Sequence, residues 1–318
     1  MQRMSHEMQY IEFLAKMNFS PDSKWTRIQQ LGRGSSGSAF EGCFENGFHF
    51  AVKVVSLHDE GSRGRNCVNQ LEQEIALLSR FKHQNIVQYY YSYKDELNLY
   101  MFMELVPRGS LRSFYQTNPV SCLLVSKYTK DILHGLKYLH DHNVIHRDIK
   151  CANILIDAQG SAKLADLGVG KIIRMNDIKS FQGSAFWTAP EVQSAIRHNQ
   201  GYGISADIWS LGCTVLEMLT RSVPYHDMTP EQALWRSLNG KLPEIPDFLS
   251  VDAQDFIQKC LKINPNDRPT ASELLEHPFV LRRPRSGNMP RRGSVLTNIF
   301  KKLSKNFANV FTNIVSDL

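Results

Sequence analysis

HRDIKCAN, at residues 146–153, is the stretch that decides the fold of this 318-residue chain, and DLG follows it at residues 166–168. Between them the two stretches hold the carboxylates of Asp148 and Asp166 and the amide of Asn153. Two carboxylates and an amide so close together in the sequence make this segment the first candidate for a catalytic site.

Upstream, residues 31–37 read LGRGSSG, a G-x-G-x-x-G loop. This spacing also opens dinucleotide-binding helices, but a strand-like segment follows it here, so the glycines are expected to let backbone amides fold over phosphates. Lys53 lies inside an apolar strand at residues 50–55, where a charge needs a partner. Glu74, on the polar side of the following amphipathic helix, is the expected partner.

The periodicity of apolar residues predicts an α+β chain in two lobes. A small antiparallel sheet lobe with one helix spans about residues 25–105, and a larger, mainly helical lobe spans about residues 109–281. Asn46-Gly47 predicts a tight hairpin turn in which both residues take positive φ. The expected strands are 25–32, 38–45, 48–57, 86–93 and 97–106, and the expected helices are 66–81, 120–142, 206–220, 230–239, 250–262 and 270–276.

Together with APE at residues 189–191, these motifs resemble in order the signature set of protein kinases, and the resemblance covers residues 25–281. It implies the bilobal kinase fold, with ATP and Mg²⁺ as cofactors. Asp148 would accept the proton of the substrate hydroxyl, and Lys150 would neutralise charge that develops on the γ-phosphate. Asn153 and Asp166 would hold Mg²⁺, while Lys53, oriented by Glu74, would reach the α- and β-phosphates.

The same resemblance supplies the remaining expected ATP contacts. Met103 would stand behind adenine, and the backbone of Glu104 and Val106 would bond the base between the apolar faces of Ala51 and Leu155. The full set expected to contact the nucleotide is Leu31, Gly32, Arg33, Gly34, Ser35, Ser36, Gly37, Ser38, Ala39, Ala51, Lys53, Glu74, Met103, Glu104, Val106, Ser110 and Leu155. Two further resemblances are structural: Asp207 would brace the catalytic loop, and Arg268 would pair with Glu191.

Lys150 and Ser184 resemble the pattern of kinases that act on serine or threonine. Ala152 argues against a strong preference for basic substrates. Ser180 and Ser184 are the candidate regulatory residues, because Arg147 beside Asp148 is typical of kinases switched by a phosphate on this loop. Five stretches resemble the MAP kinase kinase kinase group, particularly its plant members, which implies MAP kinase kinases as protein substrates. They are residues 70–75, 136–140, 149–155, 207–215 and 277–280.

Three residues depart from the family pattern: Ser36 replaces an aromatic residue, Ala39 a valine and Leu167 the phenylalanine of DFG. The smaller side chain of Ala39 removes contact worth about 1–2 kcal/mol, at about 0.8 kcal/mol per carbon, which predicts weaker ATP binding. These departures leave open a second class of function, a catalytically weak or inactive pseudokinase that serves as a scaffold.

Composition limits the class of protein and the cellular compartment that we expect for the chain. Hydrophobic residues make up 42% and charged residues 21%, and no apolar run is long enough for a membrane span or a signal peptide. The six cysteines show no zinc or disulfide spacing, which predicts free thiols and a cytoplasmic location, with nuclear or peripheral membrane sites left open.

The excess of positive charge lies in the tail, residues 282–318, where eight Lys or Arg residues face one acid, Asp317. The rest of the chain is nearly neutral, and no nucleic-acid partner is expected. A basic amphipathic helix in the tail has three possible targets: the kinase domain itself, calmodulin and a membrane surface. Residues 1–24 form an N-terminal extension to which we assign no function.

Overall fold

The computed structural model describes residues 24–34, 37–57, 81–166, 185–192 and 202–281. The chain divides into two compact units, Met1–Arg282 and Arg283–Leu318, and all described residues belong to the first. The predicted helix at 66–81, apart from its last residue Phe81, and the whole tail lie outside the described residues.

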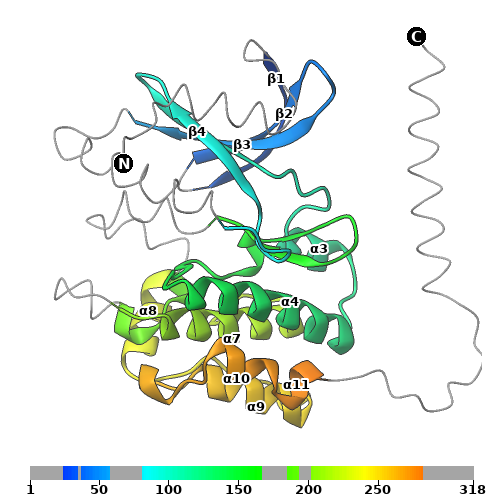
Figure 1. The fold of residues 1–318 in the computed structure, drawn as a ribbon. Coiled ribbons are helices and arrows are strands. Elements are labelled where there is room, and N and C mark those ends of the chain that lie inside the picture. Colours follow the sequence, from blue (N-terminus) through cyan, green and yellow to red (C-terminus); the bar gives the residue numbers. More distant parts are fainter. Residues whose placement is uncertain (1–23, 35–36, 58–80, 167–184, 193–201, 282–318) are drawn as a thin grey trace, which may run out of the picture. The chain divides into compact units, whose positions relative to one another are not determined.

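A five-stranded antiparallel sheet forms the first part of this unit (Figure 1), in the order β1-β2-β3-β5-β4. Its apolar side chains gather into a small aromatic core of Phe44, Phe50, Val52, Tyr91 and Phe102, in which the rings of Phe50 and Phe102 lie 5.2 Å apart. The strands are β1 (Trp25–Gly34), β2 (Gly37–Phe44), β3 (His49–Ser56), β4 (Tyr89–Lys94) and β5 (Asn98–Met103).

The hairpin predicted at Asn46-Gly47 joins β2 to β3, but its turn differs from the expected one. Only Gly47 has positive φ, at 83°, and its N–H donates to the carbonyl of Phe44 at 2.9 Å. Phe44 and Phe48 then pair across the turn, while the side chain of Asn46 accepts the N–H of Phe48. The turn is therefore a longer one that closes with a left-handed glycine, which leaves Asn46 free to serve as a side-chain acceptor.

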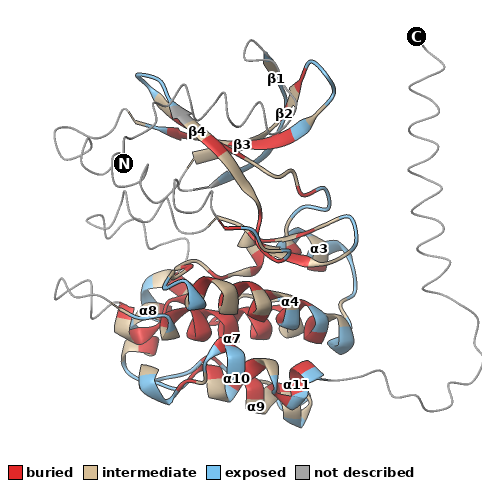
Figure 2. Cartoon of the chain, viewed as in Figure 1, coloured by how far each residue is buried: buried red, intermediate tan, exposed pale blue. Residues whose placement is uncertain are grey.

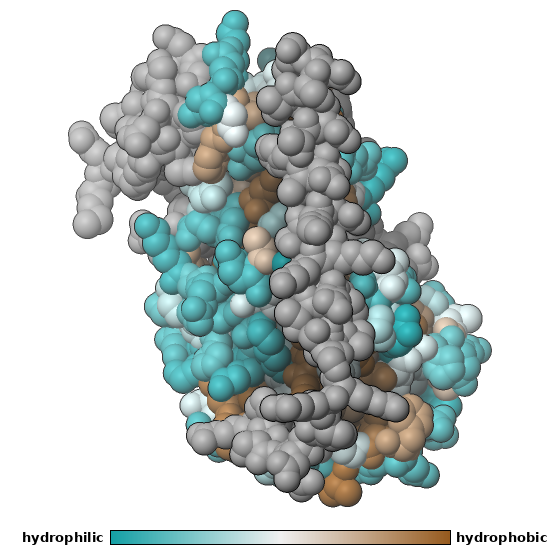
Figure 3. Space-filling view, turned by 90° about the vertical axis from the view of Figure 1, so that its right-hand side faces the viewer, coloured by the Kyte–Doolittle hydropathy of each residue, from teal (hydrophilic) through white to brown (hydrophobic). Residues whose placement is uncertain are grey.

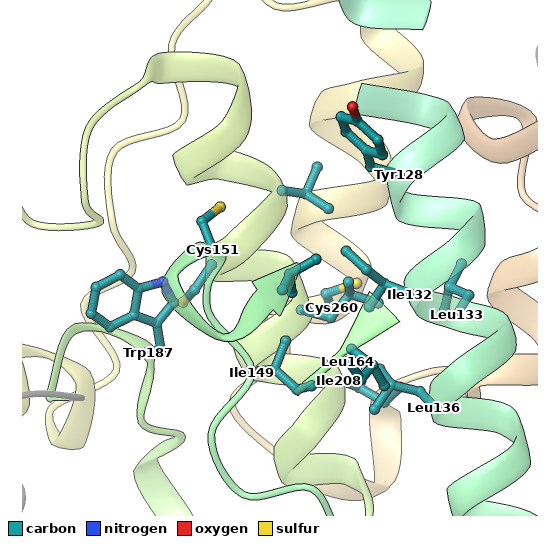
Figure 4. Close-up of a cluster of buried hydrophobic side chains, with 14 of the residues drawn as sticks. Tyr128, Ile132, Leu133, Leu136, Ile149, Cys151, Leu164, Trp187, Ile208 and Cys260 are labelled. Carbon is teal, nitrogen blue, oxygen red and sulfur yellow. The ribbon is translucent and has the colours of Figure 1, made fainter. Parts of the chain in front are cut away.

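Helices make up the second part, and most begin at a Ser or Thr whose side chain accepts a backbone N–H of the first turn. α7 is buried at every position from Ala206 to Met218 and packs against α4 and α9 (Figure 2). Ile132 and Leu136 project from α4 into the same core (Figure 4). The helices are α3 (Leu111–Thr117), α4 (Cys122–Asp141), α7 (Ser205–Thr220), α8 (Pro230–Leu238), α9 (Val251–Cys260), α10 (Ala271–Leu275) and α11 (Pro278–Leu281).

The α+β architecture is confirmed, with three local differences from the expected elements. First, β4 begins at Tyr89 and not at Ile86, because the N–H of Val87 donates to the carbonyl of Leu164 and the N–H of Leu164 donates to the carbonyl of Asn85. Second, β5 ends at Met103 and not at residue 106. Third, the sequence did not predict α3, α11 or the short hairpin of β6 (Ile154–Ile156) and β7 (Ala162–Leu164), which are too short for a periodic signal.

The described surface is mixed in character. The face in Figure 3 is mainly hydrophilic, with smaller hydrophobic areas between. No helix in the described part of the chain is both long enough and apolar enough to cross a bilayer. The cysteines within it, Cys43, Cys122, Cys151, Cys213 and Cys260, are free thiols.

Candidate active site

The loop that carries HRDIKCAN runs from the end of α4 to β6, and Asp207 of α7 holds its first residues. The Asp207 carboxylate accepts the backbone N–H groups of His146 at 2.8 Å and Arg147 at 2.9 Å. It also lies 3.0 Å from Nε2 of His140 on α4. Arg147 takes a left-handed φ of 71°, a conformation that costs energy and persists only where surrounding contacts offset that cost. The predicted bracing contact of Asp207 is therefore present.

Three predicted catalytic residues meet on one carboxylate. Lys150 donates from Nζ to Oδ2 of Asp148 at 2.8 Å, and Asn153 donates from Nδ2 to the same oxygen at 2.8 Å. Asn153 also donates to the backbone carbonyl of Asp148 at 2.9 Å. A short 3₁₀ helix, Cys151–Asn153, makes this return of the chain possible. Asp148 is thus held in one orientation, as a group that accepts a substrate proton must be.

Asp166 comes close to this cluster through the backbone, since the N–H of Ala165 donates to the carbonyl of Asn153 at 2.9 Å. Its carboxylate binds Nζ of Lys53 on β3 at 2.5 Å, which joins the sheet to the loop after β7. Lys53 is 12% exposed and Asp166 32% exposed at the side chain. The expected partner of Lys53, Glu74, lies outside the described residues.

The residues expected around ATP come from neighbouring strands of the sheet and from β6. Ala51 pairs with Met103, and Ala39 lies between Gly32 of β1 and Lys53 of β3. Leu155 on β6 forms a bridge with Ser110, at the start of α3. The glycine loop closes at Gly37, whose φ of 132° is open to glycine and strained for other residues. The expected contacts on β1, β2, β3 and β5 thus lie on neighbouring strands, and their role in nucleotide binding stays a prediction.

Sequence reasoning missed a second role for Glu104, which was expected to contribute its backbone only. Its carboxylate binds Nζ of Lys163 on β7 at 2.9 Å and accepts the N–H of Gln88 at 3.1 Å. The connection between the sheet and β7 therefore includes a side-chain ion pair directly beside Met103. Lys163 carries no motif, so only the fold could reveal this pairing.

The predicted pair of Arg268 and Glu191 is present. Nη1 and Nη2 of Arg268 bind the two carboxylate oxygens at 2.6 and 2.8 Å, in the bidentate geometry that favours arginine. Arg268 also donates to the carbonyls of Lys262 and Ser205, and its guanidinium lies over the ring of Trp209. Arg268 thus connects the APE motif to the N-terminal end of α7.

Several predicted site residues lie outside the described residues, and their roles stay predictions. They are Ser35, Ser36, Glu74, Leu167, Ser180 and Ser184.

The sheet, the helical part and the cluster of Asp148, Lys150, Asn153 and Asp166 together define a protein kinase. The chain belongs to this family, because residues 25–280 match the protein kinase domain. Protein kinases use ATP with a divalent metal, generally Mg²⁺. The residues present fit that pair: Asn153 and Asp166 offer oxygen ligands, and Lys53 adds a cation for phosphate.

Known proteins with similar sequences narrow the family further. The chain is 58% identical over 260 residues to mitogen-activated protein kinase kinase kinase 1 of Arabidopsis thaliana, covering 82% of this chain and 43% of that protein. It is 54% identical over 279 residues to mitogen-activated protein kinase kinase kinase 9 of the same plant, covering 88% and 35%. With mitogen-activated protein kinase kinase kinase 1b of Physcomitrium patens the identity is 49% over 268 residues, covering 84% and 35%. The matched regions thus span less than half the length of these relatives.

Proposed function

We propose that this chain transfers the γ-phosphoryl group of ATP to serine or threonine hydroxyls of MAP kinase kinases, and so acts as a MAP kinase kinase kinase. The observation that carries the proposal is the shared carboxylate of Asp148, which Lys150 and Asn153 both contact at 2.8 Å. High identity to plant proteins named as MAP kinase kinase kinases supports the substrate class.

Each residue has a task that follows from its position. Asp148 accepts the proton of the incoming hydroxyl and orients its oxygen, and Lys150 offsets the negative charge that grows on the transferred group. Asn153 and Asp166 would hold the cation, and Lys53 would supply positive charge to the phosphates. ATP and Mg²⁺ supply the phosphoryl group and the charge that neutralises its oxygens.

A transfer assay on a panel of purified MAP kinase kinases, with phosphosites mapped by mass spectrometry, tests this proposal. The wild-type protein should phosphorylate at least one member, and Asp148→Asn should abolish the transfer. Asp141→Asn is the matched control, because Asp141 is exposed at the end of α4 and pairs only with Lys137 among the described residues. Folded wild-type protein without transfer to any member would favour the scaffold alternative and overturn the proposal.

Regulation, tail and location are parts of the same proposal. Phosphorylation of Ser180 would switch the activity, and unchanged activation of Ser180→Ala would contradict this.

The basic tail would bind the kinase domain, calmodulin or a membrane surface, and truncation at Arg282 with activity and localisation unchanged would exclude all three. We place the protein in the cytoplasm because its cysteines show no disulfide spacing.

A further inference from the structure

The most exposed large apolar side chains of the described residues lie between α8 and the first turn of α9. Val251 is 81% exposed, Phe248 is 78% exposed and Trp235 is 59% exposed, and no other large apolar side chain of the described residues exceeds 53%. Single exposed apolar side chains are normal, whereas a group of them marks a surface that another molecule covers. We call Phe248 and Val251, at the start of α9, the α9 patch.

The backbone around Phe248 is fixed by hydrogen bonds. Nε2 of Gln254 donates to the carbonyl of Asp247 at 3.2 Å and to the carbonyl of Leu249 at 2.9 Å, on either side of Phe248. Leu249 is buried in the core of the helical part, and the side chain of Ser250 caps the first turn of α9. The exposed ring is therefore held in place before any partner arrives, so binding would cost little ordering.

The surroundings of the α9 patch are acidic. Residues 242–258 include no Lys or Arg, and Asp255 is already paired with groups of the kinase domain. Glu244 and Asp247 are exposed and form no ion pair with any described residue. An apolar surface with such a rim fits a segment that carries apolar side chains among lysines or arginines. The acids of this stretch are Glu244, Asp247, Asp252 and Asp255.

The tail, residues 282–318, has the complementary composition. It carries eight Lys or Arg residues against one acid, Asp317. Apolar residues recur in it at helical spacing, and Lys301, Lys302 and Lys305 stand among them. The chain thus contains a segment of the chemistry that the α9 patch would select. The apolar residues of the repeat are Leu296, Ile299, Phe300, Leu303, Phe307, Val310, Phe311 and Ile314.

The start of the tail is close enough to the α9 patch for this contact. The tail follows Leu281, the last residue of α11, and α11 packs against α9. α9 has 10 residues, so it is about 15 Å long at about 1.5 Å per residue. Residues 282–295, which precede the apolar repeat, span up to about 45 to 50 Å when extended. The repeat can therefore reach any point along α9.

We propose that the α9 patch and its acidic rim form the surface of the kinase domain that binds the basic tail of the same chain. Apolar side chains of the tail would cover Phe248 and Val251, and its lysines would face Glu244 and Asp247. This inference rests on the part of the proposed function that concerns the tail. It selects the kinase domain among the three targets and names the surface.

Cross-linking of the full chain tests the contact without relying on activity. A carbodiimide joins a lysine amine directly to a carboxylate that touches it, and mass spectrometry maps the joined peptides. We expect links from Lys301, Lys302 or Lys305 to Glu244 or Asp247. A mixture of isotopically light and heavy chains tells whether the two peptides come from one molecule. Links between light and heavy peptides alone would show that a second copy supplies the tail, and would overturn the proposal.

A double variant, Phe248→Ser with Val251→Ser, removes the apolar surface and keeps the acids. The yield of the tail links should fall by about ten-fold. Leu123→Ser is the matched control: Leu123 is 51% exposed at the start of α4, in a stretch without acids from residue 105 to residue 130. Its links should equal those of wild type. All four side chains concerned are exposed or absent from the core, so the variants should fold.

Two further results would overturn the proposal. The first is an equal yield of tail links in wild type and the double variant. The second is tail lysines that link to no acid of the α9 rim, whether or not the chain then binds calmodulin or sediments with vesicles of anionic lipid. Phosphate transfer to a MAP kinase kinase is measured on the same samples. Absent transfer with the expected links present would contradict the proposed kinase activity and leave the tail contact standing.

Discussion

Lys53 and Asp166 are separated by 113 residues in the sequence, and their side chains meet at 2.5 Å between Nζ and Oδ1. This is a direct bond between the sheet and the loop that follows β7. The acidic and basic members of the pair come from motifs that the sequence identifies separately, and only the fold brings them together. In the proposed reaction Lys53 would contact the phosphates of ATP, and Asp166 would hold the cation. The bond between the two side chains therefore brings both groups to the same place.

Lys53→Met should lower kcat/KM by about 100-fold or more, because a fixed cation at the phosphates is worth several kcal/mol in a site of this kind. Steady-state phosphorylation of a MAP kinase kinase measures this. Lys137→Met is the matched control: Lys137 is 40% exposed and pairs on the surface with Asp141, so its loss should leave the rate unchanged. Equal rates for wild type and Lys53→Met would refute the assignment.

Gly37→Ala should weaken ATP binding by about ten-fold or more. An added methyl group at Gly37 would collide with the carbonyl of Val54, and φ at this position is 132°. Gly47→Ala is the comparison, because Gly47 has a φ of 83° and no atom within 4 Å of an added methyl group. It carries backbone strain of about 1–2 kcal/mol without the collision. Titration with a fluorescent nucleotide should show weaker binding by Gly37→Ala than by Gly47→Ala. Similar affinities would show that Gly37 has no special role.

Asp207→Ala should destabilise the protein strongly, since it leaves the N–H groups of His146 and Arg147 without their acceptor. Each unsatisfied buried group costs about 1–3 kcal/mol. Asp207→Asn keeps one acceptor oxygen and should lose less stability than Asp207→Ala. Urea unfolding measures both free energies, and an unchanged midpoint for Asp207→Ala would mean that the loop finds other acceptors.

Much of this site follows from the sequence because its residues occur in short motifs whose chemistry is local. HRDIKCAN alone contains Asp148, Lys150 and Asn153, and its eight residues fold back on themselves through a single 3₁₀ turn. The hairpin at Asn46-Gly47 was located correctly and its turn type was not, because the choice depends on how Phe44 and Phe48 pair.

The rest of the site depends on contacts between distant segments. Lys163 meets Glu104 across 59 residues, and Glu217 meets Tyr115 across 102 residues. One signal for the second pair is present in the sequence: Glu217 is the only acid among residues 208–219 of the apolar helix α7, where a charged group needs hydrogen-bond donors. It does not say which donors, since Trp187 and Tyr115 are two aromatic residues among many.

The pH dependence of stability tests the environment of Glu217. Burial raises the pKa of its carboxyl above the usual 4.5, against the hydrogen bonds from Tyr115, Cys151 and Trp187, which lower it. The folded state therefore binds this proton more tightly than the unfolded chain. Its contribution to the free energy of unfolding is fully present below pH 4.5 and is lost as the pH rises through the folded pKa.

Glu217→Gln has no such proton, so its stability relative to wild type should increase as the pH rises from about 4 to 8, by about 1.4 kcal/mol for each unit of raised pKa. Burial raises the pKa of the neighbouring Tyr115, Cys151 and Cys213 further above this range. Urea midpoints at constant ionic strength measure the difference between the two proteins. A difference that shrinks as the pH rises would mean that the hydrogen bonds outweigh burial and that the carboxylate is held ionised.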